Sequence, residues 1–198
     1  MNFLAHFHLA WPDEGLIAGA LEGDYFKGPL RGQLPAHLER GVRLHRAIDA
    51  HTDNHPLIQQ LRLQLPPELR RYAGILIDLS FDHYLSVYWS DFSSVPLTEF
   101  SRGIHSILRA QEASLSDGAR TMLARLVEFD ILTRYRQWDT VLATAARIGE
   151  RFQRHNPFLD LELKLEPAKH GLEQVFLNFY PELQSFCGER TAQLNAFA

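Results

Sequence analysis

Apolar residues recur every three or four positions through much of this chain, and the clearest run follows the pair Pro66-Pro67. Residues at that spacing share one face of an α-helix, so the pattern predicts a long helix with a buried face. No hairpin dipeptide separates alternating segments, and a β-sheet therefore finds little support. The apolar run comprises Leu69, Ala73, Leu76, Ile77, Phe81 and Leu85.

Proline and acidic residues mark where other helices begin. Proline is favoured at the first helical position and acids in the first turn, so the segment Pro12–Glu14 predicts a short helix. Another helix is predicted to start at Pro35, run through Ile48 and end before Pro56, with a loop over Gly23–Gly32 ahead of it. Further helices are predicted near residues 96–113, 117–130, 138–154 and 170–186, and a short strand over 158–165, where apolar and charged residues alternate.

These elements predict an all-α fold, a helical bundle of about seven helices. The 198 residues are expected to form a single domain, residues 1–198, which is long enough to bury a core without staples. The single cysteine, Cys187, cannot form an internal disulfide, which fits a reducing compartment, and we expect it in the core.

Length of apolar runs and net charge exclude some classes of protein. No apolar run approaches the ~20 residues that cross a bilayer, and the first residues lack the basic stretch of a signal peptide. We therefore expect a cytoplasmic protein that does not contact membranes. The net charge of −4 at pH 7 argues against a protein held on nucleic acid by bulk electrostatics.

Arginine dominates the basic residues, since it accounts for seventeen of the twenty. Nine arginines fall between residues 102 and 154, against six acids. Guanidinium groups suit carboxylate and phosphate partners, so this segment is either a solvated helical surface or a docking patch for an acidic protein. The candidate docking residues are Arg102, Arg109, Arg120, Arg125, Arg134 and Arg136.

Histidine and aspartate crowd into the first 83 residues, which hold seven of the ten histidines. His45 and Asp49 are four apart within the predicted helix that starts at Pro35, so they share a face. Neutral imidazole and carboxylate together suit divalent ions such as manganese, iron or zinc. The alternative is an exposed stripe in which Arg43 or Arg46 pairs with Asp49.

A second polar group, Asp78, Asp82 and His83, lies inside the apolar helix predicted after Pro66. Two aspartates one turn apart in such a setting call for a cation, because an unpaired buried carboxylate is costly. The alternative places both aspartates in water and His83 at the edge of the core.

Two more candidate positions lie nearer the start of the chain. Asp24 sits in a loop bounded by glycines, either as a solvated turn residue or as a metal ligand next to Lys27, whose charge would suit a phosphoryl oxygen. His6 and His8 are two apart, so they would share a face on an extended segment but not on a helix. We favour His6 as the functional one.

Other hydrolytic chemistries find little support in the motifs. The chain has no G-x-S-x-G nucleophile elbow, no cysteine–histidine motif and no phosphate-cradling G-x-x-x-x-G-K-[ST] loop. Hydrolysis by a metal-activated water is the remaining common chemistry.

Four motifs occur in a characteristic order. They are MNFLAHFHLA at 1–10, GALEGDYFKG at 19–28, GVRLHRAIDAHTDNHP at 41–56 and DLSFDHYLSVYW at 78–89. Together they resemble the acyl carrier protein phosphodiesterase family, also called acyl carrier protein hydrolyase. Ala20 and His51 depart from that pattern, where asparagine and a more apolar residue would be expected.

The resemblance implies an all-helical protein from a divergent branch of the His-Asp phosphohydrolases, although the doublet in this chain runs Asp-His. It implies removal of the 4′-phosphopantetheine arm from holo acyl carrier protein, with manganese as the favoured divalent cation and magnesium or iron as substitutes. Carried over by motif, the expected metal ligands are Asp24, His45, Asp49, Asp82, His83 and His6, with Asp53 next, and the expected catalytic residues are Asp24, His45, Asp49, Lys27 and Arg46.

Two other interpretations stay open at this point. A His-Asp phosphohydrolase acting on a nucleotide or another small phosphoester would use the same metal site but need no protein-docking face. A helical binding module would carry the histidines and aspartates as salt-bridged surface, and manganese would then leave its melting temperature unchanged.

Overall fold

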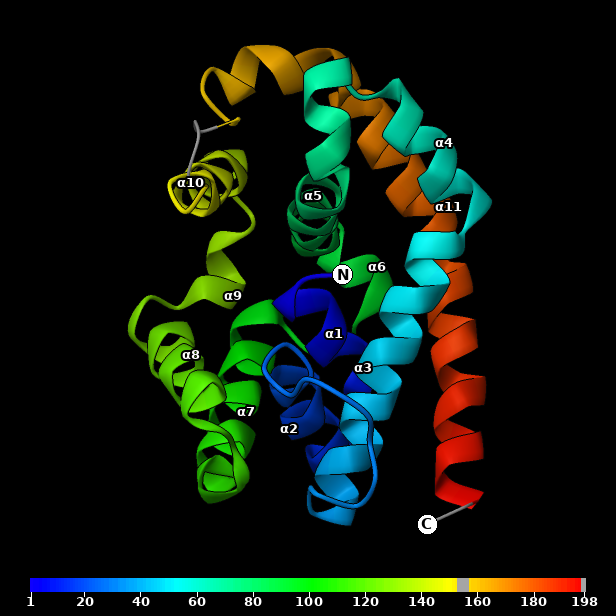
Figure 1. Cartoon of the computed structure of the whole chain (residues 1–198), viewed down its shortest axis with the longest axis vertical. Coiled ribbons are helices and arrows are strands. Elements are labelled where there is room, and N and C mark those ends of the chain that lie inside the picture. The colour runs from blue at the N-terminus through cyan, green and yellow to red at the C-terminus, as the bar shows by residue number, and fades with distance from the viewer. Residues whose placement is uncertain (153–156, 197–198) are drawn as a thin grey trace.

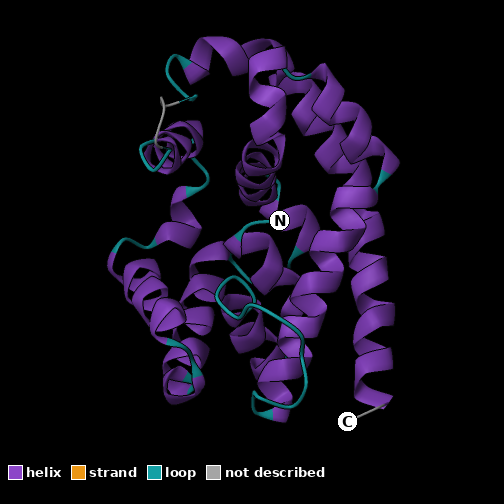
Figure 2. Ribbon diagram, in the orientation of Figure 1, coloured by secondary structure: helices purple, strands orange, loops and turns teal. Residues whose placement is uncertain are grey.

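A computed structural model describes residues 1–152 and 157–196. Within these ranges every regular element is a helix (Figure 2), so the predicted all-α fold is confirmed for the described chain. It contains eleven α-helices and two 3₁₀-helices there, where the sequence predicted roughly seven helices. In chain order the elements are α1 (Phe3–Ala10), α2 (Glu14–Glu22), α3 (Ala36–Asn54), α4 (Pro56–Gln64), the 3₁₀-helix η1 (Pro67–Tyr72), α5 (Ala73–Val87), α6 (Trp89–Phe92), α7 (Leu97–Ala110), the 3₁₀-helix η2 (Glu112–Ser114), α8 (Asp117–Glu128), α9 (Ile131–Arg134), α10 (Trp138–Gly149) and α11 (Leu161–Ala196).

Helix α1 lies near the centre of the molecule (Figure 1), where it packs on α2, α3 and α5. Its apolar side chains Leu4, Ala5 and Phe7 are fully buried. The long helix α11 runs along one side and packs against α3, α4 and α5. Although α11 has 36 residues, neither it nor any other described helix has an apolar stretch that could span a membrane.

Most predicted helix starts lie close to the observed ones. Asp13 precedes α2, and its carboxylate accepts a hydrogen bond from the backbone of Leu16 at 2.9 Å, which satisfies a free N–H of the first turn. Helix α3 follows Pro35 directly. The segment after Pro66 begins as η1 and becomes α-helical only at Ala73.

The strand predicted over residues 158–165 is wrong, because α11 begins at Leu161. Leu161 and Leu165 are four apart and face the core, whereas Leu163 between them is 80% exposed. The alternation therefore came from one exposed leucine on a helix whose buried face has ordinary helical spacing. Helix α11 also extends the predicted helix 170–186 in both directions. The helix predicted over 138–154 is shorter than expected, because α10 ends at Gly149 and residues 150–152 are not helical; residues 153 and 154 lie outside the described residues.

Glycines allow α2 and α3 to approach each other closely. A Cβ atom on Gly41 of α3 would lie 2.7 Å from both the carbonyl oxygen of Gly15 and the Cα of Gly19 on α2. Only residues without a side chain fit at such a crossing. One turn further along each helix, Gly23 lies against the ring of His45 in the same way.

Asp82 joins α5 to the start of α1. Its two carboxylate oxygens accept hydrogen bonds from the backbone N–H groups of Leu4 at 2.9 Å and Ala5 at 3.0 Å. First-turn N–H groups have no partner within their own helix, and a carboxylate suits the positive end of the helix dipole. Burial nevertheless raises the pKa of Asp82 to about 7, a shift that these two bonds oppose.

Candidate metal centre

Three side chains from two helices converge next to the N-terminal end of α1. They are His6 on α1 and His45 and Asp49 on α3, and one ligand atom of each lies within 4.8 Å of the others. His6 Nε2 is 3.1 Å from Asp49 Oδ1, and His45 Nε2 is 3.2 Å from Asp49 Oδ2. The i, i+4 spacing thus joins His45 to Asp49 as predicted, while His6 reaches them through the packing of α1 on α3.

Stacking fixes the two imidazole rings. Their centroids are 4.0 Å apart and their planes differ by 14°, and the side chains of His6 and His45 are almost completely buried. Neither Nδ1 atom has a hydrogen-bond partner among the described residues, so both rings offer Nε2 to the same point near Asp49. The backbone of Gly23 closes the far side of the His45 ring.

The protonation states of this cluster suit a cation. Burial, and then the neighbouring His45, lowers the pKa of His6 to about 3, so that its imidazole is neutral. Burial alone would raise the pKa of Asp49, but hydrogen bonds from His45 and His6 hold it well below its usual range. His6 is therefore a neutral imidazole and Asp49 an ionised carboxylate, which are the net protonation states in which these groups bind metal ions.

Asp24 borders the cluster from the loop that follows α2. Its Oδ1 is 3.8 Å from His45 Nε2, and its side chain is 45% exposed. Burial raises the pKa of Asp24, and the charge of Asp49 adds to the shift, whereas His45 opposes it. This carboxylate is placed to complete a site made by the other three residues.

Lys27 and Arg46 hold this loop in place. Lys27 Nζ donates to the backbone oxygen of Asp24 at 2.6 Å. Arg46 donates to the carbonyl oxygens of Gly28 at 2.8 Å and Phe26 at 2.9 Å. Both cations, which the sequence suggested for catalysis, thus contact backbone around Asp24.

Asp82 and His83 do not join the cluster. The carboxylate of Asp82 is bound to the start of α1, and His83 Nδ1 lies 2.8 Å from the carbonyl oxygen of Tyr135. His8, on another face of α1 from His6, contacts the hydroxyl of Tyr180 at 2.8 Å. These polar groups satisfy helix ends and carbonyls in the core, which sequence spacing alone does not distinguish from a ligand role.

Asp78 lies beside the cluster instead. The amino group of Met1 is 3.0 Å from Asp78 Oδ1 and 3.2 Å from Asp49 Oδ1. Although burial would lower it, these two carboxylates raise the pKa of that amino group to about 11. A positive charge is therefore held between Asp78 and Asp49 at this point, and not between Asp78 and Asp82, the pair whose spacing suggested a cation.

A cavity of about 400 Å³ opens onto Asp49 and Asp78. Arginines from α4 and η1 also line this cavity. The sequence analysis did not single them out, because they lie between the motifs at 41–56 and 78–89 and belong to neither. The available sequence signal was the presence of Arg62, Arg70 and Arg71 within about two helical turns of a motif, close to acidic residues such as Asp53. The lining arginines are Arg62, Arg70 and Arg71.

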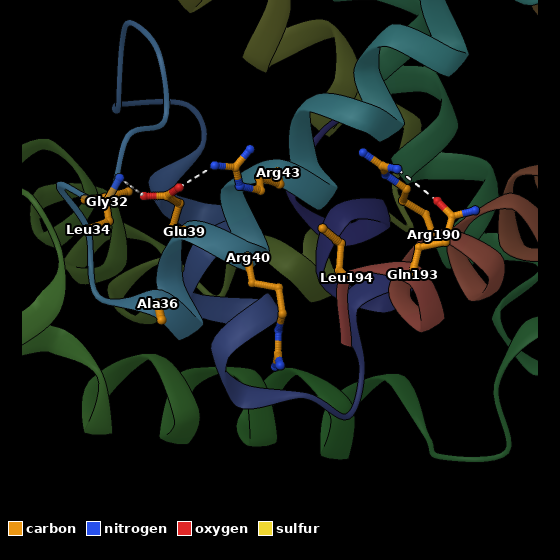
Figure 3. A pocket seen from close by; sticks show the side chains of 9 residues that line it. All are labelled: Gly32, Leu34, Ala36, Glu39, Arg40, Arg43, Arg190, Gln193 and Leu194. Carbon is orange, nitrogen blue, oxygen red and sulfur yellow. Dashed lines mark hydrogen bonds and ion pairs between the residues drawn. The ribbon is translucent and has the colours of Figure 1, made fainter. Parts of the chain in front are cut away.

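A larger cavity, of about 720 Å³, lies between the loop before α3, α3 itself and the end of α11 (Figure 3). None of the cluster residues lines it. Arg43 there donates to Glu39, which in turn accepts from the backbone of Gly32, so its charge is already paired. Size alone therefore does not mark the site.

The candidate docking arginines lie on α7, α8 and α9 and just beyond. Arg120 pairs with Asp117 of its own helix, while Arg125 and Arg134 are exposed. Burial raises the pKa of Tyr25, next to Asp24, and Arg125 opposes that shift, which places Arg125 on the side of the Asp24 loop.

Fold and cluster together define a class: an all-helical protein in which two buried imidazoles and one carboxylate lie close enough together that they could hold a metal ion. No solved structure matches the chain, so the predicted likeness to His-Asp phosphohydrolases stays a prediction.

Sequence comparison then gives the family. The family described as acyl carrier protein phosphodiesterase matches residues 1–183. Proteins of that name from Enterobacter sp. (strain 638) and Klebsiella pneumoniae are 33% and 31% identical over 188 residues, which cover 92% of this chain and 95% of each relative. One from Salmonella agona is 31% identical over 93% of this chain and 96% of the relative. The chain belongs to the acyl carrier protein phosphodiesterase family and is a hydrolase.

Proposed function

We propose that this chain hydrolyses the phosphodiester that joins 4′-phosphopantetheine to a serine of holo acyl carrier protein, with a divalent metal bound at His6, His45 and Asp49. The observation that carries the proposal is the convergence of these three side chains in a member of this family. The names of the relatives support acyl carrier protein as the substrate.

Manganese is the ion we favour, with magnesium or iron as substitutes. Imidazole suits transition metals better than magnesium, which prefers oxygen ligands alone. Asp24 is the fourth donor we propose, since its Oδ1 lies beside His45. A divalent ion bound there would lower the pKa of a water molecule and polarise the phosphoryl oxygen.

In this proposal the surrounding residues position the metal ligands. Lys27 and Arg46 hold the loop so that Asp24 faces His45. Asp82 binds the start of α1 and thereby helps to position His6 relative to α3. Asp82 and His83 were both expected as ligands from the motif. In this proposal Asp82 instead supports α1, and His83 contacts the carbonyl oxygen of Tyr135 away from the cluster.

Intact-protein mass spectrometry tests the function directly. We expect holo acyl carrier protein to lose one phosphopantetheine when incubated with the chain and manganese, and to stay intact with a chelator. Asp49→Asn and His45→Asn should abolish the loss, whereas His170→Gln, at a side chain 82% exposed, should retain it. Cleavage of nucleotides or small phosphodiesters with holo protein untouched would instead favour the small-phosphoester hydrolase.

Docking of the acidic carrier protein is proposed for the arginine face of α7–α9. Opposite charges raise the encounter rate and set orientation more than they affect the bond-breaking step. We therefore expect Arg125→Glu with Arg134→Glu to raise KM several-fold and leave kcat nearly unchanged. Steady-state kinetics with Arg190→Glu as the matched reversal checks this, and an unchanged KM in the double variant would refute the docking face.

A further inference from the structure

The cavity over Asp49 has a wall of guanidinium groups that no step above uses. Arg62 comes from α4, and Arg70 and Arg71 come from η1, and all three line the cavity together with Asp49 of the cluster. We infer that these three arginines form an oxyanion subsite that binds the phosphoryl oxygens of the substrate. The inference rests on the proposed function for the identity of the phosphoester.

The arginines differ in how far the protein already fixes them. Arg70 donates from Nε to the carbonyl oxygen of Leu65 at 3.0 Å and from a terminal nitrogen to that of Leu63 at 2.8 Å, so its guanidinium is held in one orientation. Arg71 is exposed and makes no hydrogen bond or ion pair within the described chain. Because the Arg70 guanidinium is already fixed, binding an anion to it costs little side-chain entropy, while Arg71 can move to meet the same anion.

Charge balance in the cavity favours an anion once a metal is bound. Its lining carries three carboxylates, those of Asp49, Asp53 and Asp78, against three guanidinium groups and the amino group of Met1. Arg62 already pairs with Asp53 at 2.6 Å, and the Met1 amino group with Asp78 at 3.0 Å. A divalent ion at the cluster would add two positive charges to this nearly neutral cavity. The charges of Arg70 and Arg71 would then have no carboxylate to neutralise them.

Four other basic residues lie near the cluster, but none of them lines this cavity. Lys27 and Arg46 contact backbone carbonyls of the loop, Arg43 contacts Glu39, and Arg40 contacts Asp13. The cavity volume of about 400 Å³ is within the usual range for small-ligand sites and accommodates a phosphate group with part of its pantetheine arm. A phosphoryl group in this cavity would contact both the arginines and the side of the cluster formed by Asp49, so that positive groups could bind its oxygens beside the proposed metal.

Binding of free 4′-phosphopantetheine and of inorganic phosphate tests the subsite without requiring turnover. We would measure both by calorimetry on the manganese-loaded protein, for wild type, Arg70→Ala, Arg71→Ala and Arg71→Lys. Arg190→Ala is the matched control, since Arg190 lines the larger cavity away from the cluster. Loss of a hydrogen bond to a charged group should weaken binding roughly 10- to 100-fold in Arg70→Ala and Arg71→Ala.

Arg71→Ala is the decisive variant, because the Arg71 side chain makes no hydrogen bond or ion pair with a described residue and its removal should leave the fold intact. Arg71→Lys should restore part of the affinity, since charge returns without the planar fork. Affinity equal to wild type in Arg71→Ala and Arg70→Ala would overturn the subsite, as would wild-type protein that binds neither ligand. Arginine-dependent binding in a protein that leaves holo acyl carrier protein intact would support the subsite and refute the proposed function instead.

Discussion

The missing side chain of Gly23 leaves room for the imidazole of His45, one of the proposed metal ligands. A Cβ atom at Gly23 would clash with the imidazole of His45, so the ring occupies space that only glycine leaves free. The backbone of Gly23 is ordinary right-handed helix at φ −56°, and alanine would be tolerated there for its own sake. Glycine is needed at this position because it lets the backbone and the His45 ring approach each other closely.

We therefore expect Gly23→Ala to displace the His45 ring and to weaken manganese binding about tenfold or more, since a misplaced donor loses its share of the site. Calorimetric titration with manganese measures the effect. Gly188→Ala, at a helical glycine with open space around it, is the control and should bind the ion as wild type does. Unchanged affinity in Gly23→Ala would show that His45 is not a ligand in this geometry.

Cys187 is a second residue whose environment decides its behaviour. It is 3% exposed, and burial raises the pKa of its thiol to about 12. A raised pKa keeps the thiol neutral across the range in which a free cysteine ionises, and the thiolate is the reactive form. We expect native protein to resist alkylation up to about pH 10 and to be labelled fully once unfolded, as mass spectrometry would record.

At the scale of helices, the crossing of α2 and α3 is the contact that places the site. Gly15, Gly19 and Gly23 follow one another at four-residue steps on α2, opposite Gly41 and His45 on α3. The same close approach that needs Gly41 brings the His45 ring against Gly23. Position of the ligand and packing of the two helices are thus one property.

Gly41→Ala should separate the two helices and destabilise the protein by roughly 1–3 kcal/mol, the usual effect of an inserted methyl group in a packed core. Gly188→Ala should have the opposite sign, with a gain of up to about 1 kcal/mol, because alanine is the better helix former where space is open. Urea denaturation of both variants checks the pair. Equal stabilities would show that α2 and α3 do not depend on this contact.

Local patterns predicted what lies within one element, and packing decided the rest. His45 and Asp49 share a helix face by spacing alone, and proline with Asp13 marked the start of α2 from side chains within four residues. His6 joins them only because α1 crosses α3, a contact between residues 39 positions apart. Asp82 and His83 had the composition of a ligand pair, yet a helix end and a carbonyl use them, and no local signal separates these roles.

For the molecule as a whole, the site ties several helices together. Asp24 follows α2, His6 lies on α1, His45 and Asp49 lie on α3, and Asp82 joins α1 to α5. A ligand that binds only the folded state raises its stability, by about 2.7 kcal/mol at 100 times its dissociation constant. Metal binding should therefore be visible in global unfolding.

We expect saturating manganese to raise the melting temperature by roughly 5–10 °C, from that stabilisation and the usual entropy of a chain of this size. His45→Asn should lose the shift. His83→Asn should melt at a lower temperature, since it gives up the contact with Tyr135, but keep the shift because His83 lies outside the cluster. Calorimetric scanning with and without the ion separates these outcomes, and a shift lost equally in both variants would return His83 to the ligand set.

The place of α11 has a consequence for how the enzyme is made. All proposed ligands and the three cavity arginines lie within the first 71 residues, so they are synthesised before the rest of the chain. Helices α3 and α4, which carry His45, Asp49 and Arg62, pack against α11, which begins only at Leu161. Segments made early often fold as they emerge, but α3 and α4 gain their packing against α11 only when the last helix has been made. We therefore expect nascent chains that end before α11 to contain every proposed ligand but to hold those ligands less firmly.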